Sequence, residues 1–102
     1  MKSTKAIKGY LIANYTIHDH ETYNKYVTAA SALNSRFKLN PIIYDSNVQV
    51  KEGIPELVVA IAEFPSFADA ERFYNSKEYQ QALQYRLAST TGTVVLAKGL
   101  KV

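Results

Sequence analysis

The amino-acid sequence predicts a single α+β domain whose elements follow in the order strand, helix, strand, strand, helix, strand. Its 102 residues fit one domain, and its 47% apolar and 21% charged residues are typical of a globular chain that buries a core. Short runs of β-branched and aromatic residues alternate with segments in which apolar residues recur at helical spacing. This order is that of the ferredoxin-like βαββαβ fold, an antiparallel sheet with the helices on one face.

Four strands are expected from runs of β-branched, aromatic and other apolar residues. These runs cover residues 10–17, 41–44, 57–62 and 93–97. The alternating residues 48–51 predict that the second strand is bent or paired into a small hairpin. Residues 57–62 are the most apolar run of the chain, and we expect them to form a central strand covered on both faces, which Pro65 ends.

Capping residues mark the expected helices. Asp19 can cap a first helix, whose apolar stripe predicts an extent of about residues 20–34. Ser66 and Asp69 have the spacing of a capping box, with Asp in place of the usual Glu or Gln, and a second helix should follow them. Ser76 is expected to interrupt this helix and to cap a further helical segment that begins at the next residue.

The central run is apolar on both faces, and this predicts an assembly. One face carries Leu57, Val59 and Ile61, and the other carries Val58, Ala60 and Ala62. Helices on one side of a sheet cover only one of these sets, and exposing the other would leave a larger apolar patch than a monomer tolerates. The sequence therefore predicts a homodimer in which two sheets pack face to face about a two-fold axis, as a dimeric α+β barrel.

Charge and composition exclude several classes of function. The net charge is only +3 with scattered basic residues, which argues against a nucleic-acid partner. The chain has no cysteine, so disulfides, thiolate metal sites and cysteine nucleophiles are excluded. No run approaches the roughly 20 apolar residues of a membrane span, and no signal peptide is recognised. We therefore expect a cytoplasmic protein with no membrane partner, a flexible tail over residues 1–7 and one domain over residues 8–102.

A metal or cofactor site is not expected. His18 and His20 flank Asp19, and such a cluster can bind a metal. However, the segment lies at a strand-to-helix junction without a third ligand, and Asp19 is better used as a helix cap. The four glycines are isolated from one another, so the chain has no glycine-rich phosphate loop. We therefore expect no cofactor and no metal ligands.

Two charged residues are candidates for chemistry. Glu63 ends the most apolar strand, where desolvation would raise the pKa of its carboxyl and make it a general base. The alternative role is a structural pair with Arg86 or a capping contact. Arg86 follows Tyr79 by seven residues, so the two share one face of a helix. An arginine that faces a pocket suits a carboxylate or enolate ligand, whereas the alternative is a surface salt bridge.

Polar and aromatic residues complete the candidate site. Asn14 is a polar residue on a largely apolar face of the first strand and therefore needs a partner. Tyr74 and Tyr79 flank the helix break at Ser76, where a cleft between helix and sheet can open. An aromatic-lined pocket with few polar groups is the usual form of a small-molecule site. The alternative is that these tyrosines belong to the core and only their hydroxyls reach water.

Two segments carry a resemblance to a known family. Residues 63–66 read Glu-Phe-Pro-Ser, and residues 73–80 read Phe-Tyr-Asn-Ser-Lys-Glu-Tyr-Gln, with Arg86 beyond them. These segments resemble the small bacterial family of the domain of unknown function 1330, and weaker similarity covers about residues 8–99. The resemblance implies a dimeric α+β barrel and no established activity. Proteins of that architecture include antibiotic-biosynthesis monooxygenases, muconolactone isomerases and haem-handling proteins.

The sequence departs from this family around the second strand. Where relatives usually have Gly-Gly-Arg before the strand, residues 38–40 are Lys-Leu-Asn. Where relatives have Arg-Gly-Gly after it, residues 44–46 are Tyr-Asp-Ser. Ligand contacts that relatives make through those arginine side chains or glycine amides are therefore not carried over to this chain.

Two classes of function follow from these observations. The first is a small-molecule protein, such as a cofactor-independent isomerase or a monooxygenase-like enzyme, which binds a small aromatic or carbonyl/carboxylate metabolite between sheet and helices. In it Glu63 would be the catalytic base, Arg86 would hold the anion, and Asn14, Tyr74 and Tyr79 would contact the ligand. We expect the charged groups of Glu63 and Arg86 to lie near the same cleft. The second class is a binding or assembly module without enzymatic activity.

Overall fold

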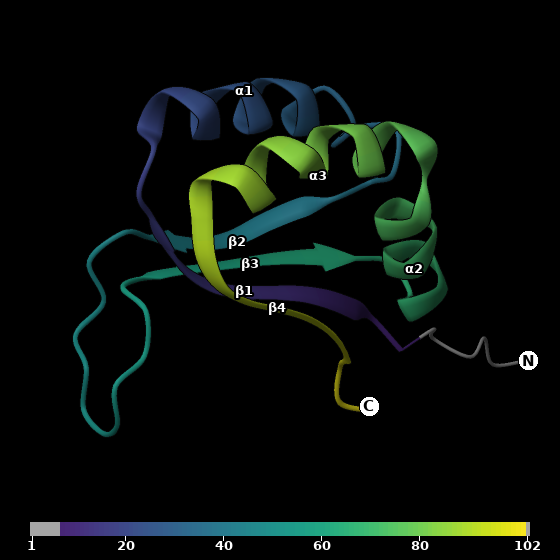
Figure 1. Cartoon of the computed structure of the whole chain (residues 1–102). Coiled ribbons are helices and arrows are strands. Elements are labelled where there is room, and N and C mark those ends of the chain that lie inside the picture. Colours follow the sequence, from purple (N-terminus) through teal and green to yellow (C-terminus); the bar gives the residue numbers. More distant parts are fainter. Residues whose placement is uncertain (1–6, 102) are drawn as a thin grey trace, which may run out of the picture.

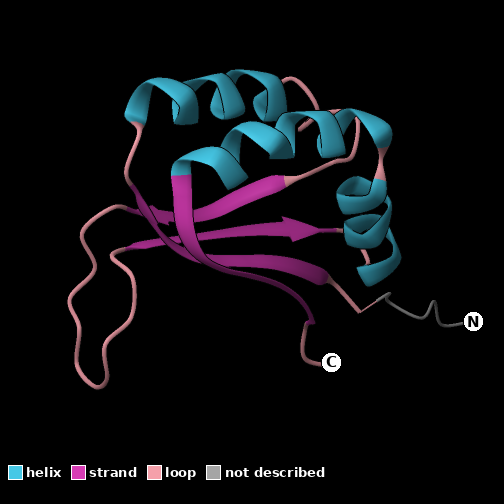
Figure 2. Cartoon of the chain, viewed as in Figure 1, coloured by secondary structure: helices cyan, strands magenta, loops and turns pink. Residues whose placement is uncertain are grey.

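The computed structural model describes residues 7–101 and has four strands and three helices. They are β1 (Gly9–Ile17), α1 (His20–Ser31), β2 (Asn40–Asp45), β3 (Val58–Phe64), α2 (Phe67–Asn75), α3 (Lys77–Ser89) and β4 (Thr90–Lys98). The strands form one antiparallel sheet in the order β2-β3-β1-β4, and the helices lie on one face of it (Figures 1 and 2). This arrangement confirms the predicted ferredoxin-like α+β fold. Most of the expected tail lies outside the described residues.

Strand parity places the core between the sheet and the helices. Leu11, Ala13 and Tyr15 alternate along β1 and are buried, since they point toward the helices. Their neighbours on β3 include Val58 and Phe64, which are buried on the same side. α2 packs against the other end of the sheet, where its Phe73 contacts this core.

Side-chain caps begin each helix at the residue that the sequence indicates. The side chain of Asp19 accepts a hydrogen bond from the Thr22 backbone N–H at 3.1 Å. Ser66 Oγ accepts from the Asp69 N–H at 3.1 Å, and Ser76 Oγ accepts from the Tyr79 N–H at 3.1 Å. The break between α2 and α3 is therefore real. None of the helices in the described part of the chain is long and apolar enough to cross a membrane.

Two element boundaries differ from those expected. α1 ends at Ser31 rather than near residue 34, because the next backbone N–H groups, of Leu33 and Asn34, bond to carbonyls three residues back and form turns instead of continuing the α-helical pattern. Residues 48–51 are not a strand, since they find no partner strand and lie in the long loop of residues 46–57 that extends away from the sheet (Figure 2). Alternation of apolar and polar residues did not make this segment a strand, because a strand also needs a neighbouring strand to pair with its backbone N–H and C=O groups.

The opposite face of the sheet is not covered by any element of the described chain (Figure 1). Ile12 of β1 lies between Ile61 of β3 and Val95 of β4, and all three point away from the helices. Val95 is 53% exposed. The central strand is therefore covered on one face only within this chain, and its second apolar set is left for the partner sheet that the predicted homodimer would supply.

Candidate functional site

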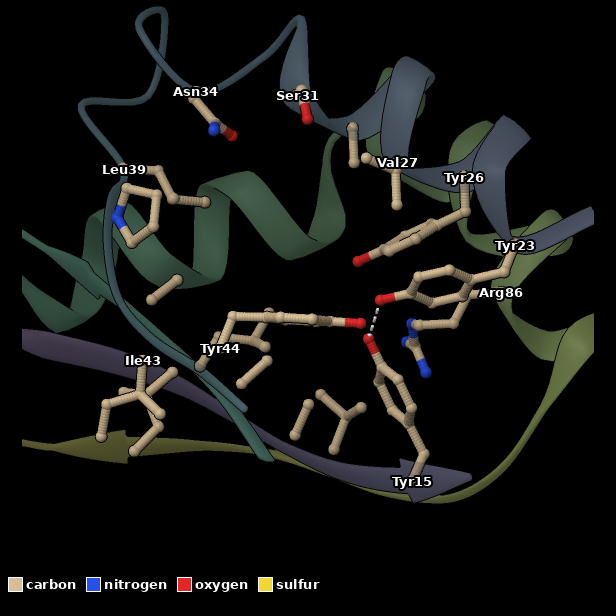
Figure 3. A pocket seen from close by; sticks show the side chains of 18 of the residues that line it. Tyr15, Tyr23, Tyr26, Val27, Ser31, Asn34, Leu39, Ile43, Tyr44 and Arg86 are labelled. Atoms are coloured by element: carbon tan, nitrogen blue, oxygen red, sulfur yellow. Dashed lines mark hydrogen bonds between the residues drawn. The ribbon is translucent and has the colours of Figure 1, made fainter. Parts of the chain in front are cut away.

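A cavity of about 440 Å³ lies between α1 and the helix-facing side of the sheet (Figure 3). It exists because α1 packs chiefly against α3 rather than directly on the strands beneath it. Its walls are mostly apolar and include Leu11, Ala13, Val27, Ala30, Leu39 and Val94. The volume is within the range of about 300–1,000 Å³ that is common for small-molecule pockets.

Tyrosine hydroxyls gather at one end of this cavity. Tyr15 of β1 and Tyr23 of α1 place their hydroxyl oxygens 2.6 Å apart. The hydroxyl of Tyr26, one turn further along α1, lies 3.0 Å from that of Tyr79 on α3. Burial raises the pKa of Tyr15, Tyr23, Tyr26 and Tyr79 above that of a free phenol. All four groups are therefore neutral hydrogen-bonding groups at physiological pH.

Arg86 lies beside these hydroxyls and also lines the cavity (Figure 3). Its side chain is on the α3 face that carries Tyr79, and the residue is only 5% exposed. The guanidinium carbon is 5.7 Å from the centre of the Tyr15 ring and 5.6 Å from that of Tyr26, which are cation–π distances. The alternative role of Arg86 in a surface salt bridge is wrong, because the side chain is buried.

The charge of Arg86 has no acidic partner within the described residues. Burial lowers the pKa of its guanidinium, but the neighbouring Tyr79 and Tyr26 side chains outweigh burial and raise it. The group therefore stays protonated, and this end of the cavity carries one uncompensated positive charge. A buried charge of this kind is costly unless an anion pairs with it.

Glu63 lies on the opposite face of the sheet from this cavity. Successive side chains of β3 alternate, so Glu63 points away from the helices while Phe64 points toward them. The Tyr10 hydroxyl donates to Glu63 Oε2 at 2.8 Å, and Lys8 Nζ is 4.0 Å from Oε1. The hydrogen bond from Tyr10 lowers the pKa of Glu63, with a smaller contribution from Lys8. The expected raised pKa and the shared cleft with Arg86 are therefore both wrong.

Asn14 also lies on the open face of the sheet and is engaged with backbone. Its Nδ2 donates to the carbonyls of Glu56 at 2.7 Å and Val58 at 2.9 Å, and its Oδ1 accepts from the Glu56 N–H at 3.2 Å. These bonds anchor the end of the 46–57 loop to β1. The predicted need for a partner is thus met within the protein, and the side chain is not in the cavity.

The two tyrosines at the helix break have separate positions. Tyr79 is fully buried in the core and reaches the cavity only through its contact with Tyr26. The ring of Tyr74 packs 5.3 Å from that of Tyr79 and does not line the cavity. The cleft is therefore under α1 rather than at the break, and Arg86 is the one proposed ligand residue that lines it.

Four tyrosines that were not predicted as site residues line the cavity, namely Tyr15, Tyr23, Tyr26 and Tyr44. For the first three, the sequence contained a pattern that could have predicted their position. Tyr15 has the same strand parity as Leu11 and Ala13, and Tyr23 and Tyr26 are three residues apart on one helix face. Tyr44 had no such signal, because its direction depends on an irregularity of β2 that strand alternation does not predict.

Of the three residues His18, Asp19 and His20, only Asp19 has a clear structural role, as the cap of α1. Asp19 receives hydrogen bonds from the backbone and the hydroxyl of Thr22, which lower the pKa of its carboxyl. His18 and His20 are both exposed at the strand-to-helix junction. Within residues 7–101, acidic and histidine side chains do not gather in any group of three that could hold a metal ion.

Comparison with solved structures supports the fold. A protein of unknown function from Rhodopseudomonas palustris is 17% identical, with a TM-score of 0.77 over 98% of this chain and 88% of that one. A cofactor-independent oxygenase, SnoaB from Streptomyces nogalater, is 11% identical, with a TM-score of 0.63 over 95% of this chain and 97% of that one. A dimeric ferredoxin-like protein of unknown function from Thermobifida fusca is 13% identical, with a TM-score of 0.63 over 100% of this chain and 97% of that one.

Comparison with protein families gives a more specific result. No curated protein matches the chain significantly. Residues 8–100 match the family described as a domain of unknown function, DUF1330. This match spans nearly the whole chain and confirms the resemblance noted in its motifs. The protein therefore belongs to the DUF1330 family.

Proposed function

We propose that this protein binds a small molecule with an apolar body and one anionic group, such as a carboxylate or an enolate, in the cavity under α1. The observation that carries the proposal is the buried guanidinium of Arg86 at the tyrosine-lined end of an apolar cavity, with no acidic partner in the described chain. An anionic ligand would supply the missing charge.

The chemistry of the site supports an oxyanion rather than a neutral ligand. A guanidinium donates two parallel hydrogen bonds to a carboxylate, and such bonds are stronger than those between neutral groups. Neutral tyrosine hydroxyls beside Arg86 can add further donors to the same oxygen atoms. The apolar walls would then cover the remainder of the ligand and exclude water from the ion pair, which strengthens it.

Binding is better supported than base catalysis. No carboxylate, histidine or lysine lines the cavity, so the described residues place no general base against a ligand there. The same cation could stabilise the oxygen of an enolate, which is the form that an isomerase or monooxygenase-like reaction would use. SnoaB is described as a cofactor-independent oxygenase, but it shares only the fold with this chain. We therefore propose ligand binding as the function. Any turnover would be limited to substrates acidic enough to lose a proton without a general base from the protein.

We also propose that the protein is a homodimer that pairs through the open face of its sheet. The uncovered cluster of Ile12, Ile61 and Val95 on this face supports the proposal. Two structures of the same fold, from Bacteroides fragilis and Thermobifida fusca, are described as dimeric. The cavity lies on the other side of the sheet, so each copy would keep its own site.

Isothermal titration with a matched acid and amide tests the ligand proposal. We expect 2-naphthoate to bind and its neutral analogue 2-naphthamide to bind much more weakly. Arg86→Met should weaken binding of the acid by roughly 10- to 100-fold, because it removes a charged hydrogen-bonding group. Arg72→Met is the control, since Arg72 is an exposed arginine of α2 outside the cavity. Equal affinity for acid and amide, or full affinity in a folded Arg86→Met variant, would overturn the proposal.

A further inference from the structure

Tyr44 reaches the cavity because β2 contains a bulge. β2 is an edge strand, and its register with β3 shifts between Pro41, opposite Ala62, and Ile43, opposite Ile61. The extra residue places Tyr44 opposite Ala60, on the side that faces the helices. In a regular ladder Tyr44 would stand opposite Val59 and point to the open face. A bulge that re-aims one side chain into a pocket is typical of a functional site.

The ring of Tyr44 lies across the cavity beneath α1. In Figure 3 the ring is seen nearly edge-on, with its hydroxyl directed toward Tyr15 and Tyr23 and with Val27 of α1 above it. All four residues line the same cavity. The Tyr44 ring and α1 therefore lie on opposite sides of the cavity, and the Tyr44 hydroxyl points to its polar end.

Tyr44 differs from the other cavity tyrosines in its exposure. Tyr15 and Tyr23 are 3% and 5% exposed, and their contacts belong to the core. Tyr44 is 56% exposed at the edge of the sheet. Tyr44 is thus not a member of the buried core cluster, and a large part of its side chain remains accessible beside the cavity.

We propose that Tyr44 is a specificity-determining residue that selects flat, aromatic or conjugated anions over puckered ones of similar size. This inference rests on the proposed function, because it assumes that the anionic group is held at Arg86. A flat ligand with its charge at that end would lie over the Tyr44 ring in an offset stack. A saturated ring of the same outline is thicker and has no π face to stack.

A pair of acids with the same charged group tests this inference by isothermal titration. The probes are 2-naphthoate and its saturated counterpart, trans-decahydro-2-naphthoate. Burial of apolar area alone would favour the saturated acid or neither. We expect the parent protein and Tyr44→Phe to prefer the flat acid by about two- to tenfold, as an aromatic stack implies. Tyr44→Leu should remove this preference. Tyr85→Leu is the control, because Tyr85 is a 41% exposed tyrosine of α3 outside the cavity.

The outcomes separate this inference from the proposed function. If both acids bind the parent equally, or if folded Tyr44→Leu keeps the preference, the role of Tyr44 is refuted while anion binding stands. Loss of the preference in Tyr85→Leu as well would also refute it, since the effect would not be local. If neither acid binds the parent, or if Arg86→Met binds both acids as the parent does, the proposed function fails and the role of Tyr44 fails with it.

Discussion

The guanidinium of Arg86 lies over the ring of Tyr26, 5.6 Å from its centre, and the Tyr26 hydroxyl is 3.0 Å from that of Tyr79. Tyr26 of α1 and Tyr79 of α3 thus flank one positive charge without neutralising it. The arrangement partly compensates the cost of burying the charge, because the ring faces attract a cation. It leaves the charge available to a ligand, and this has consequences for stability.

Arg86→Met should raise the stability of the protein while it weakens ligand binding. Replacing a buried ion pair by apolar side chains of similar size is often neutral or stabilising by about 1–4 kcal/mol, and Arg86 has no acidic partner in the described residues whose attraction would be lost. Loss of the ring contacts offsets part of this gain, so we expect about 1 kcal/mol, measured by urea unfolding without ligand. Arg72→Met should leave the free energy of unfolding nearly unchanged. A loss of more than about 2 kcal/mol in Arg86→Met would show that the arginine is structural.

Ser76→Ala should destabilise the protein by about 0.5–2 kcal/mol, the usual cost of removing an N-cap. The reason is that Ser76 Oγ accepts the Tyr79 N–H and donates to the Phe73 carbonyl, so it joins the end of α2 to the start of α3. Ser35→Ala is the matched control, because Ser35 lies exposed in the turns after α1. Equal urea midpoints for the two variants would contradict the capping role.

The bond between Tyr10 and Glu63 should make stability depend on pH in the acid range. The hydrogen bond from Tyr10 holds the pKa of Glu63 below its ordinary value of 4.5 in the folded state. A lowered folded pKa contributes stability that is present above 4.5 and is lost as the pH falls through the folded pKa. Tyr10→Phe should therefore be less stable than the parent near neutral pH, and the difference should shrink on acidification. A difference that stays constant from neutral to acid pH would refute this.

Gly92→Ala should destabilise the fold by about 3 kcal/mol or prevent folding. Gly92 has a φ of 155°, and an added Cβ would collide with the Asn14 carbonyl oxygen and with Tyr15. Strain and overpacking each cost of order 1–3 kcal/mol. Gly53→Ala is the contrasting variant, since Gly53 has a φ of 82° but open space around it. It should cost only about 1–2 kcal/mol. Thermal unfolding followed by circular dichroism compares them, and equal losses would contradict the steric argument.

Val95→Lys should convert the proposed homodimer to a monomer. The added charge would lie on the open face beside Ile12, where two packed sheets would otherwise bury it without a partner. Light scattering should give twice the chain mass of 11.4 kDa for the parent and the chain mass for the variant. Leu87→Lys is the control, because Leu87 is exposed on α3, away from the sheet face. A folded, monomeric parent protein would refute the dimer.

The order of the elements and the starts of the helices could be predicted from the sequence alone. Asp19, Ser66 and Ser76 each accept a hydrogen bond from a backbone N–H three residues away, so their roles follow from neighbouring residues. The apolar runs identified all four strands, although β4 begins at Thr90 rather than at residue 93. Such features depend on contacts over a few residues, which the sequence displays directly.

The residues that make up the site could not be predicted in this way, because they depend on how distant segments pack together. Glu63 and Arg86 are separated by the sheet, because strand parity sends Glu63 to the open face while α3 carries Arg86 to the other. The cavity exists because α1 packs on α3 and stands off from the strands. Tyr44 enters it because one extra residue in β2 reverses the direction of its side chain. Each of these outcomes depends on how segments distant in sequence align, and a shift of one residue in a strand moves a side chain to the opposite face.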